Sequence, residues 1–482
     1  MKTITPFKIF LFLIAVFGCC ALLSVVIPKE GIKIGETSFK FFHWSSLTDT
    51  TNNQPAIENV EAYLASLDSL ASDSLANDTL NVDRTQSITS LQFADGNSAA
   101  LFTFFESLEQ LQGKGGNVHV LHYGDSQIES DRMTNYLREK WQGIYGGVGP
   151  GLVCPVPITA SAAISQSQSS NWTRHTVYGF GDGKNVHSKY GVLGSYGRFT
   201  SPKDAASINP QDTTTAWLEF RPSSMASSSC RQYSKVAIYM GHHHYGVRLN
   251  ILADDSLISS EIIPPTAEAT KYTYRLGSTP KRLRLEFAGP DSPDVQAVLL
   301  ENDNGIHVDN IALRGSSGTI FRKIQGSELG SQIRDLNAKL IILQFGGNSV
   351  PGLSSAKGGK DFGNYFQSQI QYLKQLHPES SILVIGPSDM STSVDGVYMT
   401  WPYLESVRNG MRDAAFAEGC AFWDMYSVMG GRNSMVSWVS SNPQYAGPDY
   451  THFTPKGARK MAELLYKAID REHELWKNAK IK

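Results

Sequence analysis

Three short and almost uninterrupted apolar runs constrain the fold of this chain more than any other feature. They cover residues 118–123, 340–345 and 382–385, and helical patterns occupy residues 97–112, 127–142, 361–376, 403–418 and 455–476. Strands that are apolar along their whole length are typical of a parallel sheet covered by helices on both faces. We therefore predict an α/β fold built around a doubly wound parallel sheet.

The stretch 151–304 interrupts this alternation with a different pattern. Short runs at 216–220, 236–240, 247–251 and 283–287 mostly alternate apolar and polar residues, and Gly, Pro, Ser and Asp separate them. Several short strands at this spacing indicate an antiparallel β-sandwich. We predict an all-β domain at residues 151–304, inserted into an α/β domain that residues 96–150 and 305–482 form together.

The N-terminus carries nineteen residues without a charge, from Ile9 to Ile27, preceded by Lys2 and Lys8. Such a run nearly spans the hydrocarbon core of a membrane and exceeds the apolar region of most cleaved signal peptides. We predict that residues 1–28 form a signal anchor, a single transmembrane helix that leaves the rest of the chain periplasmic or otherwise extracytoplasmic. The alternative is a lipoprotein signal, because residues 16–19 (VFGC) loosely match a lipobox.

Residues 29–95 are predicted to form an acidic, Ser/Thr-rich spacer. Between Asp49 and Asp83 the chain has seven acidic residues and no Lys or Arg, which favours solvated chain. Helical periodicity within residues 56–75 leaves a docked helix open as an alternative. The net charge of −2 and the pI near 6.6 provide no bulk attraction for nucleic acid, so none is expected as a partner.

Cysteine and histidine spacing indicates neither a disulfide framework nor a metal site. Only Cys154, Cys230 and Cys420 follow the apolar N-terminal run, which allows one bridge between Cys154 and Cys230 or three buried thiols. No Cys/His spacing is typical of zinc, and the histidine run 242–244 lies between strand-like stretches whose side chains alternate faces. We predict no metal or organic cofactor.

Three polar blocks follow predicted strands or precede a helix of the α/β domain. Ser126 comes directly after the run 118–123 and opens a predicted helix, whose N–H groups favour developing negative charge. Asn348 follows the run 340–345, and its amide can donate to an oxyanion. Asp449 and His452 precede the last helix and supply the base and orienting carboxylate that a serine nucleophile needs. Each block alone is more often structural, but together they predict a serine hydrolase.

These blocks resemble the SGNH/GDSL hydrolase superfamily, with GDS around Ser126, GxN at residues 346–348 and DxxH at residues 449–452. The resemblance implies a flavodoxin-like, three-layer α/β/α domain in which Ser126, His452 and Asp449 form a triad. It also implies an oxyanion hole made by the N–H groups of Ser126 and Gly315 and by the Asn348 amide. Ser349 stands where the family's GxND block has Asp, which weakens the match of that block.

The insert extends the resemblance to peptidoglycan O-acetylesterases with a carbohydrate-binding-like β-sandwich. This implies an esterase that removes O-acetyl groups from an acetylated cell-wall or surface glycan, peptidoglycan being favoured, through an acyl-enzyme. The alternatives are an O-acyltransferase with the same triad and a non-catalytic glycan-binding protein on a hydrolase fold. In the insert, Trp172, Tyr239 and Tyr245 are candidates for stacking on sugars, although core positions are the commoner role for such residues.

Overall fold

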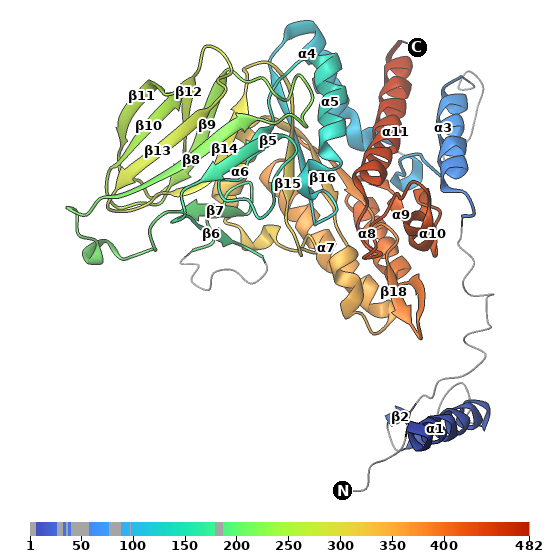
Figure 1. Ribbon diagram of the computed structural model, residues 1–482. Coiled ribbons are helices and arrows are strands. Elements are labelled where there is room, and N and C mark those ends of the chain that lie inside the picture. Colours follow the sequence, from blue (N-terminus) through green and yellow to red (C-terminus); the bar gives the residue numbers. More distant parts are fainter. Residues whose placement is uncertain are drawn as a thin grey trace, which may run out of the picture.

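The computed structural model describes residues 6–26, 32–34, 37–39, 57–76, 88–96, 98–178 and 187–481. A five-stranded sheet at its centre has the order β15-β3-β16-β17-β20, and all of its strands are parallel. This is the alternating α/β architecture expected from the apolar runs (Figure 1). The strands are β3 (Asn117–Gly124), β15 (Gly305–Ala312), β16 (Ala338–Gln344), β17 (Ser381–Ile385) and β20 (Ala421–Trp423).

Helices cover both faces of this sheet. Successive side chains of each strand point to opposite faces, so each strand packs against helices on both sides. Val120, Ile342 and Leu383 pack on one face against α4 (Phe102–Lys114), α5 (Thr134–Tyr145) and α11 (Pro455–Ile481). Leu121 and Leu343 pack on the other face against α6 (Gly326–Asp335), α7 (Ala356–Leu376) and α8 (Leu404–Ala417). Burial on both faces explains why these strands read as continuous apolar runs.

Between α5 and β15 the chain forms two antiparallel sheets, as the alternating pattern indicated. One has the order β11-β10-β13-β8-β5 and the other the order β12-β9-β14-β7-β6, with β4 paired to β14. The bounds are β4 (Gly151–Val153), β5 (Ile164–Gln168), β6 (Thr173–Thr176), β7 (Ser195–Arg198), β8 (Thr214–Pro222), β9 (Lys235–Gly241), β10 (Val247–Ala253), β11 (Ser256–Ile263), β12 (Thr270–Arg275), β13 (Leu283–Gly289) and β14 (Asp294–Glu301). The chain thus consists of an α/β domain with an additional β domain.

The β domain packs firmly on the α/β domain through the sheet that contains β9 and β14. Ile238 and Val298 point into the core between the two antiparallel sheets. Tyr239 and Leu299, on the opposite face of the same strands, share a core with Leu121 of the central sheet. Both strands are therefore buried throughout, so the insert is fixed to the α/β domain.

Helix α1 (Pro6–Val26) contains the N-terminal apolar run up to Val26, and β1 (Ile32–Ile34) and β2 (Thr37–Phe39) form an antiparallel pair. Among the residues that the structure describes, no helix meets the length and hydropathy of a membrane span. The predicted anchor therefore has no support from the structure. Lys2 and much of the predicted spacer lie outside the described residues.

One part of the predicted spacer is packed rather than solvated. Helix α3 (Val60–Ala76) lies against α11, and Leu64 and Leu67 are each only 2% exposed. Asp68 accepts hydrogen bonds from Lys460 and Lys467 of α11. The docked helix, rather than uninterrupted solvated chain, is therefore what these residues form.

Candidate active site

Ser126 lies in a tight turn at the carboxyl end of β3. A side chain at Gly124 would approach Ile128 to 2.9 Å and the Gln344 carbonyl to 3.1 Å, so the turn requires glycine there. The helix predicted to begin at Gln127 begins only at Thr134 in α5. Ser126 is consequently held by a turn and not by the N-terminus of an α-helix, which corrects the helix-dipole argument made from the sequence.

The delayed start of α5 has a local cause. Ser130 and Asp131 have positive φ values of 59° and 65°, which are incompatible with a continuous right-handed helix. Asp131 is fully buried beside the Arg138 guanidinium, and the Asn310 amide donates to the Ile128 carbonyl at 2.9 Å. These side-chain contacts replace helical hydrogen bonds and turn the chain between Ser126 and α5.

The three predicted triad residues form a continuous hydrogen-bond relay. Ser126 Oγ lies 2.7 Å from His452 Nε2, and His452 Nδ1 lies 2.7 Å from Asp449 Oδ2. Each contact is within hydrogen-bond range, and the order of groups is nucleophile, base and orienting carboxylate. The imidazole of His452 is therefore placed to accept the Ser126 proton while Asp449 fixes its orientation.

Backbone N–H groups of the loop that carries Asp449 and His452 also keep the Asp449 carboxylate ionised. Asp449 Oδ1 accepts hydrogen bonds from the backbone N–H groups of Thr451 at 3.1 Å and His452 at 3.0 Å. Burial raises the pKa of Asp449, but these N–H groups and the His452 ring lower it more, so the net pKa lies below the ordinary value. Asp449 is thus ionised when His452 takes up a proton.

Gln127 joins the serine turn to the histidine loop, a contact that the sequence did not reveal. Its side-chain amide donates to the Thr451 carbonyl at 2.6 Å and to Ser388 Oγ at 2.9 Å, and its oxygen accepts from the Phe453 N–H at 3.4 Å. Gln127 is buried and adjacent to the nucleophile. It therefore holds the base at a fixed position relative to Ser126.

Two of the three predicted oxyanion donors have free N–H groups. In the described part of the chain, the backbone N–H groups of Ser126 and Gly315 have no hydrogen-bond acceptor. Gly315 follows β15, and the Leu313 N–H bonds to the Gly124 carbonyl at 2.7 Å, which brings the Gly315 loop beside the serine turn. Arg314 reinforces this contact through Glu129, with Nε 2.9 Å from the carboxylate.

The Asn348 amide has protein partners in this structure, and its predicted oxyanion-hole role stays a prediction. Its amide nitrogen donates to Asp125 Oδ2 at 3.2 Å and to the Ser316 carbonyl at 3.1 Å, so both of its hydrogens have partners. Burial raises the pKa of Asp125 to about 6, although hydrogen bonds from the Gln127 N–H and Asn348 counteract it. In this structure Asn348 links the serine turn to the Gly315 loop, and the two backbone N–H groups remain the free donors.

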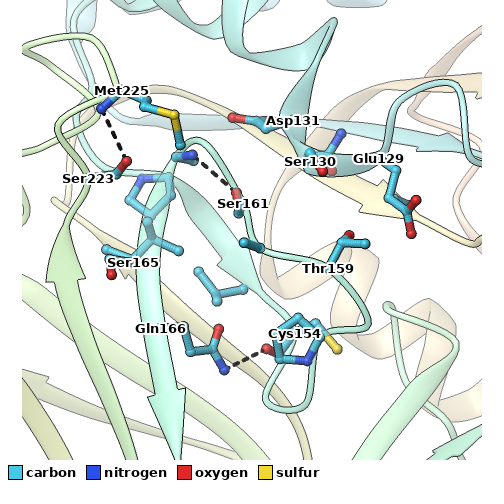
Figure 2. A pocket seen from close by; sticks show the side chains of 18 of the residues that line it. Glu129, Ser130, Asp131, Cys154, Thr159, Ser161, Ser165, Gln166, Ser223 and Met225 are labelled. Carbon is cyan, nitrogen blue, oxygen red and sulfur yellow. Dashed lines mark hydrogen bonds between the residues drawn. The ribbon is translucent and has the colours of Figure 1, made fainter. Parts of the chain in front are cut away.

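A small cavity of about 110 Å³ opens at the triad, and a separate groove of about 840 Å³ is lined by residues of both domains. The groove is bounded by the α/β domain at Glu129 and Asp131 and by the insert at Ser161 and Gln166 (Figure 2). Arg174 and Arg221 also line it. Glu129 in the groove wall accepts a hydrogen bond from Arg314, the neighbour of Gly315, so the groove wall and the Gly315 loop are in contact.

Among the described residues, the three cysteines form no disulfide, and two of the three candidate sugar-stacking residues are buried. Cys154, Cys230 and Cys420 are free thiols. Trp172 packs edge-on against Phe199 and Phe287 in the insert core, and Tyr239 is buried. Neither Trp172 nor Tyr239 is placed to stack on a sugar, and both are core residues.

The fold is similar to that of a solved peptidoglycan O-acetylesterase, with a TM-score of 0.61 over 80% of this chain and 99% of the other at 20% identity. A GDSL-like lipase from Bacteroides ovatus covers 64% of this chain and 98% of its own, at 13% identity and a TM-score of 0.23. A carbohydrate acetylesterase from Sinorhizobium meliloti covers 34% and 79%, at 11% identity and a TM-score of 0.26. No protein-family model and no curated protein matches the chain. In its fold the chain therefore resembles that peptidoglycan O-acetylesterase.

Proposed function

We propose that the protein is a serine esterase that removes O-acetyl groups from an acetylated glycan, with peptidoglycan as the favoured substrate. The observation that carries the proposal is the relay from Ser126 through His452 to Asp449, with 2.7 Å at both contacts. The overall similarity to a peptidoglycan O-acetylesterase supports the choice of substrate. A serine with an aligned base and free N–H donors has what acyl transfer needs.

The proposed reaction proceeds in two halves. Ser126 Oγ attacks the acetyl carbonyl while His452 Nε2 takes the hydroxyl proton, and the N–H groups of Ser126 and Gly315 donate to the oxyanion. The bond to the sugar oxygen then breaks, and His452 returns its proton to that oxygen. Water next attacks the acetyl-Ser126 ester with His452 as base, which releases acetate and restores the serine.

The groove supports a polymeric glycan as substrate. It has walls from both domains, and its polar side chains, among them Gln166 and Arg174, match a ligand rich in hydroxyl and amide groups. We propose that a glycan strand bound there extends past Glu129 and the Gly315 loop, so that an acetylated hydroxyl reaches Ser126. Extracytoplasmic location and membrane anchoring belong to the same proposal, and they rest on the apolar N-terminal run.

The test is acetate release from O-acetylated peptidoglycan by the full chain in detergent. An aryl acetate serves as a small substrate, and Ser126→Ala is compared with Ser368→Ala, a serine on α7 outside the site. We expect release from both substrates by the wild type and Ser368→Ala and none by Ser126→Ala. Turnover of the aryl acetate alone would refute the glycan assignment. Loss of polymer acetyl groups without free acetate would indicate transfer to another acceptor, and no turnover of either would favour the binding protein.

A further inference from the structure

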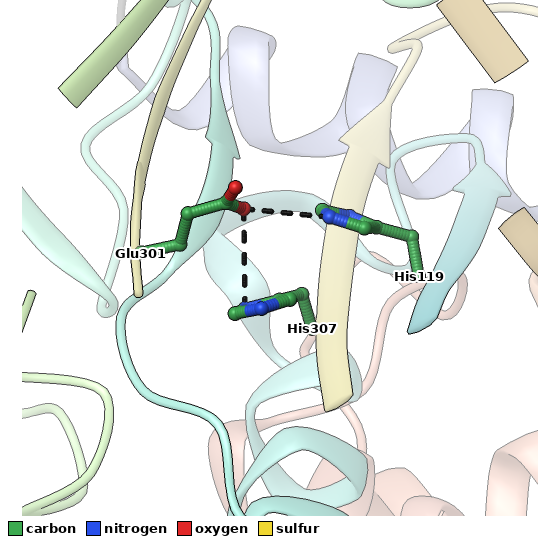
Figure 3. A group of neighbouring side chains, drawn as sticks. All are labelled: His119, Glu301 and His307. Atoms are coloured by element: carbon green, nitrogen blue, oxygen red, sulfur yellow. Dashed lines mark ion pairs between the residues drawn. The ribbon is translucent and has the colours of Figure 1, made fainter. Parts of the chain in front are cut away.

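A second cluster of reactive side chains lies at the junction of the two domains. His119 of β3 and His307 of β15 are paired in the register of the central sheet, and Glu301 is the last residue of β14 in the insert. Both histidines are 0% exposed and Glu301 is 1% exposed. Figure 3 shows the three side chains converging on one point.

The spacing of these groups suits a small cation. Glu301 Oε2 lies 3.4 Å from His119 Nε2 and 3.9 Å from His307 Nδ1, and one ligand atom from each residue lies within 4.8 Å of the others. Bonds of about 2.1 Å in a tetrahedral zinc site put ligand atoms roughly 3.4 Å apart. Two histidines, one carboxylate and a water form a coordination set that zinc accepts.

Neighbouring residues orient the proposed ligands. Asp309 Oδ2 lies 2.8 Å from His119 Nδ1, which leaves Nε2 to face Glu301. The second Asp309 oxygen accepts from the Leu152 N–H at 2.7 Å. Lys235 Nζ lies 2.9 Å from Glu301 Oε1 and leaves Oε2 for the cluster. A carboxylate behind a histidine is the usual support of a metal-bound imidazole.

Several buried nitrogen and oxygen atoms of this cluster have no hydrogen-bond partner among the described residues. His119 Nε2, Glu301 Oε2 and both ring nitrogens of His307 are buried and make no hydrogen bond within the part of the chain that the structure describes. A proton on His119 is the competing explanation, because Asp309 and Glu301 together outweigh burial and raise its pKa. That proton would pair His119 with Glu301 but would leave both nitrogens of His307 unsatisfied.

We propose that His119, His307 and Glu301 bind one divalent transition-metal ion of the zinc class, which joins the insert to the central sheet. The site lies toward the amino end of β3, about 17 Å of extended strand from Gly124 and the serine turn. Its role is therefore structural, and the hydrolytic residues are separate from it. This inference does not depend on the proposed esterase activity.

The experiment measures metal binding by the full chain in detergent, after removal of metal with a chelator. Co²⁺ is added as the probe, its visible spectrum is recorded, and Zn²⁺ is then used to displace it. We expect about one equivalent per chain, a tetrahedral cobalt spectrum and a proton released on binding. Less than a tenth of an equivalent at saturating Co²⁺ would overturn the proposal.

Variants locate the site. Glu301→Gln and His307→Gln should each weaken cobalt binding at least 100-fold, and Asp309→Asn should weaken it roughly 10- to 100-fold. His122→Gln is the matched control. His122 is a buried histidine of β3, the strand that also carries His119, and its nitrogens contact Gln344 and Thr134. Unchanged binding in the ligand variants would refute the assignment. If they do not fold, X-ray absorption of the wild-type zinc protein decides, because sulfur ligation or a shell without imidazole would contradict it.

Discussion

Replacing Gln127 by Ala should slow the proposed hydrolysis without unfolding the protein. The substitution removes three hydrogen bonds, and two of them tie the histidine loop to the serine turn: the bond to the Thr451 carbonyl at 2.6 Å and the bond from the Phe453 N–H at 3.4 Å. Each bond contributes about 0.5–1.5 kcal/mol, so alignment of His452 loses about 1–3 kcal/mol. Because 1.36 kcal/mol corresponds to a tenfold change in rate, kcat/KM should fall roughly 5- to 150-fold.

The assay is steady-state hydrolysis of an aryl acetate, with urea unfolding of the same samples. A misaligned base lowers kcat and leaves KM nearly unchanged, since Gln127 acts through His452. Gln142→Ala is the matched control, because this buried glutamine of α5 donates to the Gly149 carbonyl away from the triad. Activity of Gln127→Ala within twofold of the wild type, or an equal loss in Gln142→Ala, would refute the positioning role.

Three further predictions concern the same site. Asp449→Asn should reduce kcat roughly 10²- to 10³-fold in the aryl acetate assay, because the amide cannot stabilise the imidazolium; a change below tenfold would contradict the relay. Gly315→Ala should cost about 1–2 kcal/mol of unfolding free energy in urea at its φ of 80°, and an unchanged unfolding free energy would contradict the left-handed backbone there. The pKa of Asp125 near 6 means that the folded state binds more protons than the unfolded state between about pH 4 and 6, so this group's contribution to stability falls as pH rises through that window. In urea unfolding at several pH values, Asp125→Asn should lose that slope, and an unchanged slope would contradict the raised pKa.

The central sheet was predictable from the sequence only where its strands are apolar. β3, β16 and β17 read as continuous apolar runs because helices bury both of their faces. β15 was not recognised because it carries buried polar residues, and His307 and Asp309 are accommodated by contacts with the insert and β3. β20 has three residues, too few to show a period.

The relay of Ser126, His452 and Asp449 was predictable because its motifs are local, but the contacts that position these residues were not. Gln127 meets Thr451 across a sequence separation of 324 residues, and no spacing rule links such a pair. The late start of α5 depends on the side chain of Asn310, a residue of β15 that donates to the Ile128 carbonyl. The cluster of His119, His307 and Glu301 likewise forms only when the insert docks, so it left no metal-binding spacing in the chain.

Covalent trapping tests directly whether Ser126 is the nucleophile. The full chain is treated with a fluorophosphonate ester, and the modified peptide is located by mass spectrometry. We predict a single modification at Ser126, at a rate that falls at least 100-fold in His452→Ala because the hydroxyl loses its base. Modification of another serine, or equal labelling of Ser126 in His452→Ala, would contradict the claim that Ser126 is a nucleophile activated by His452.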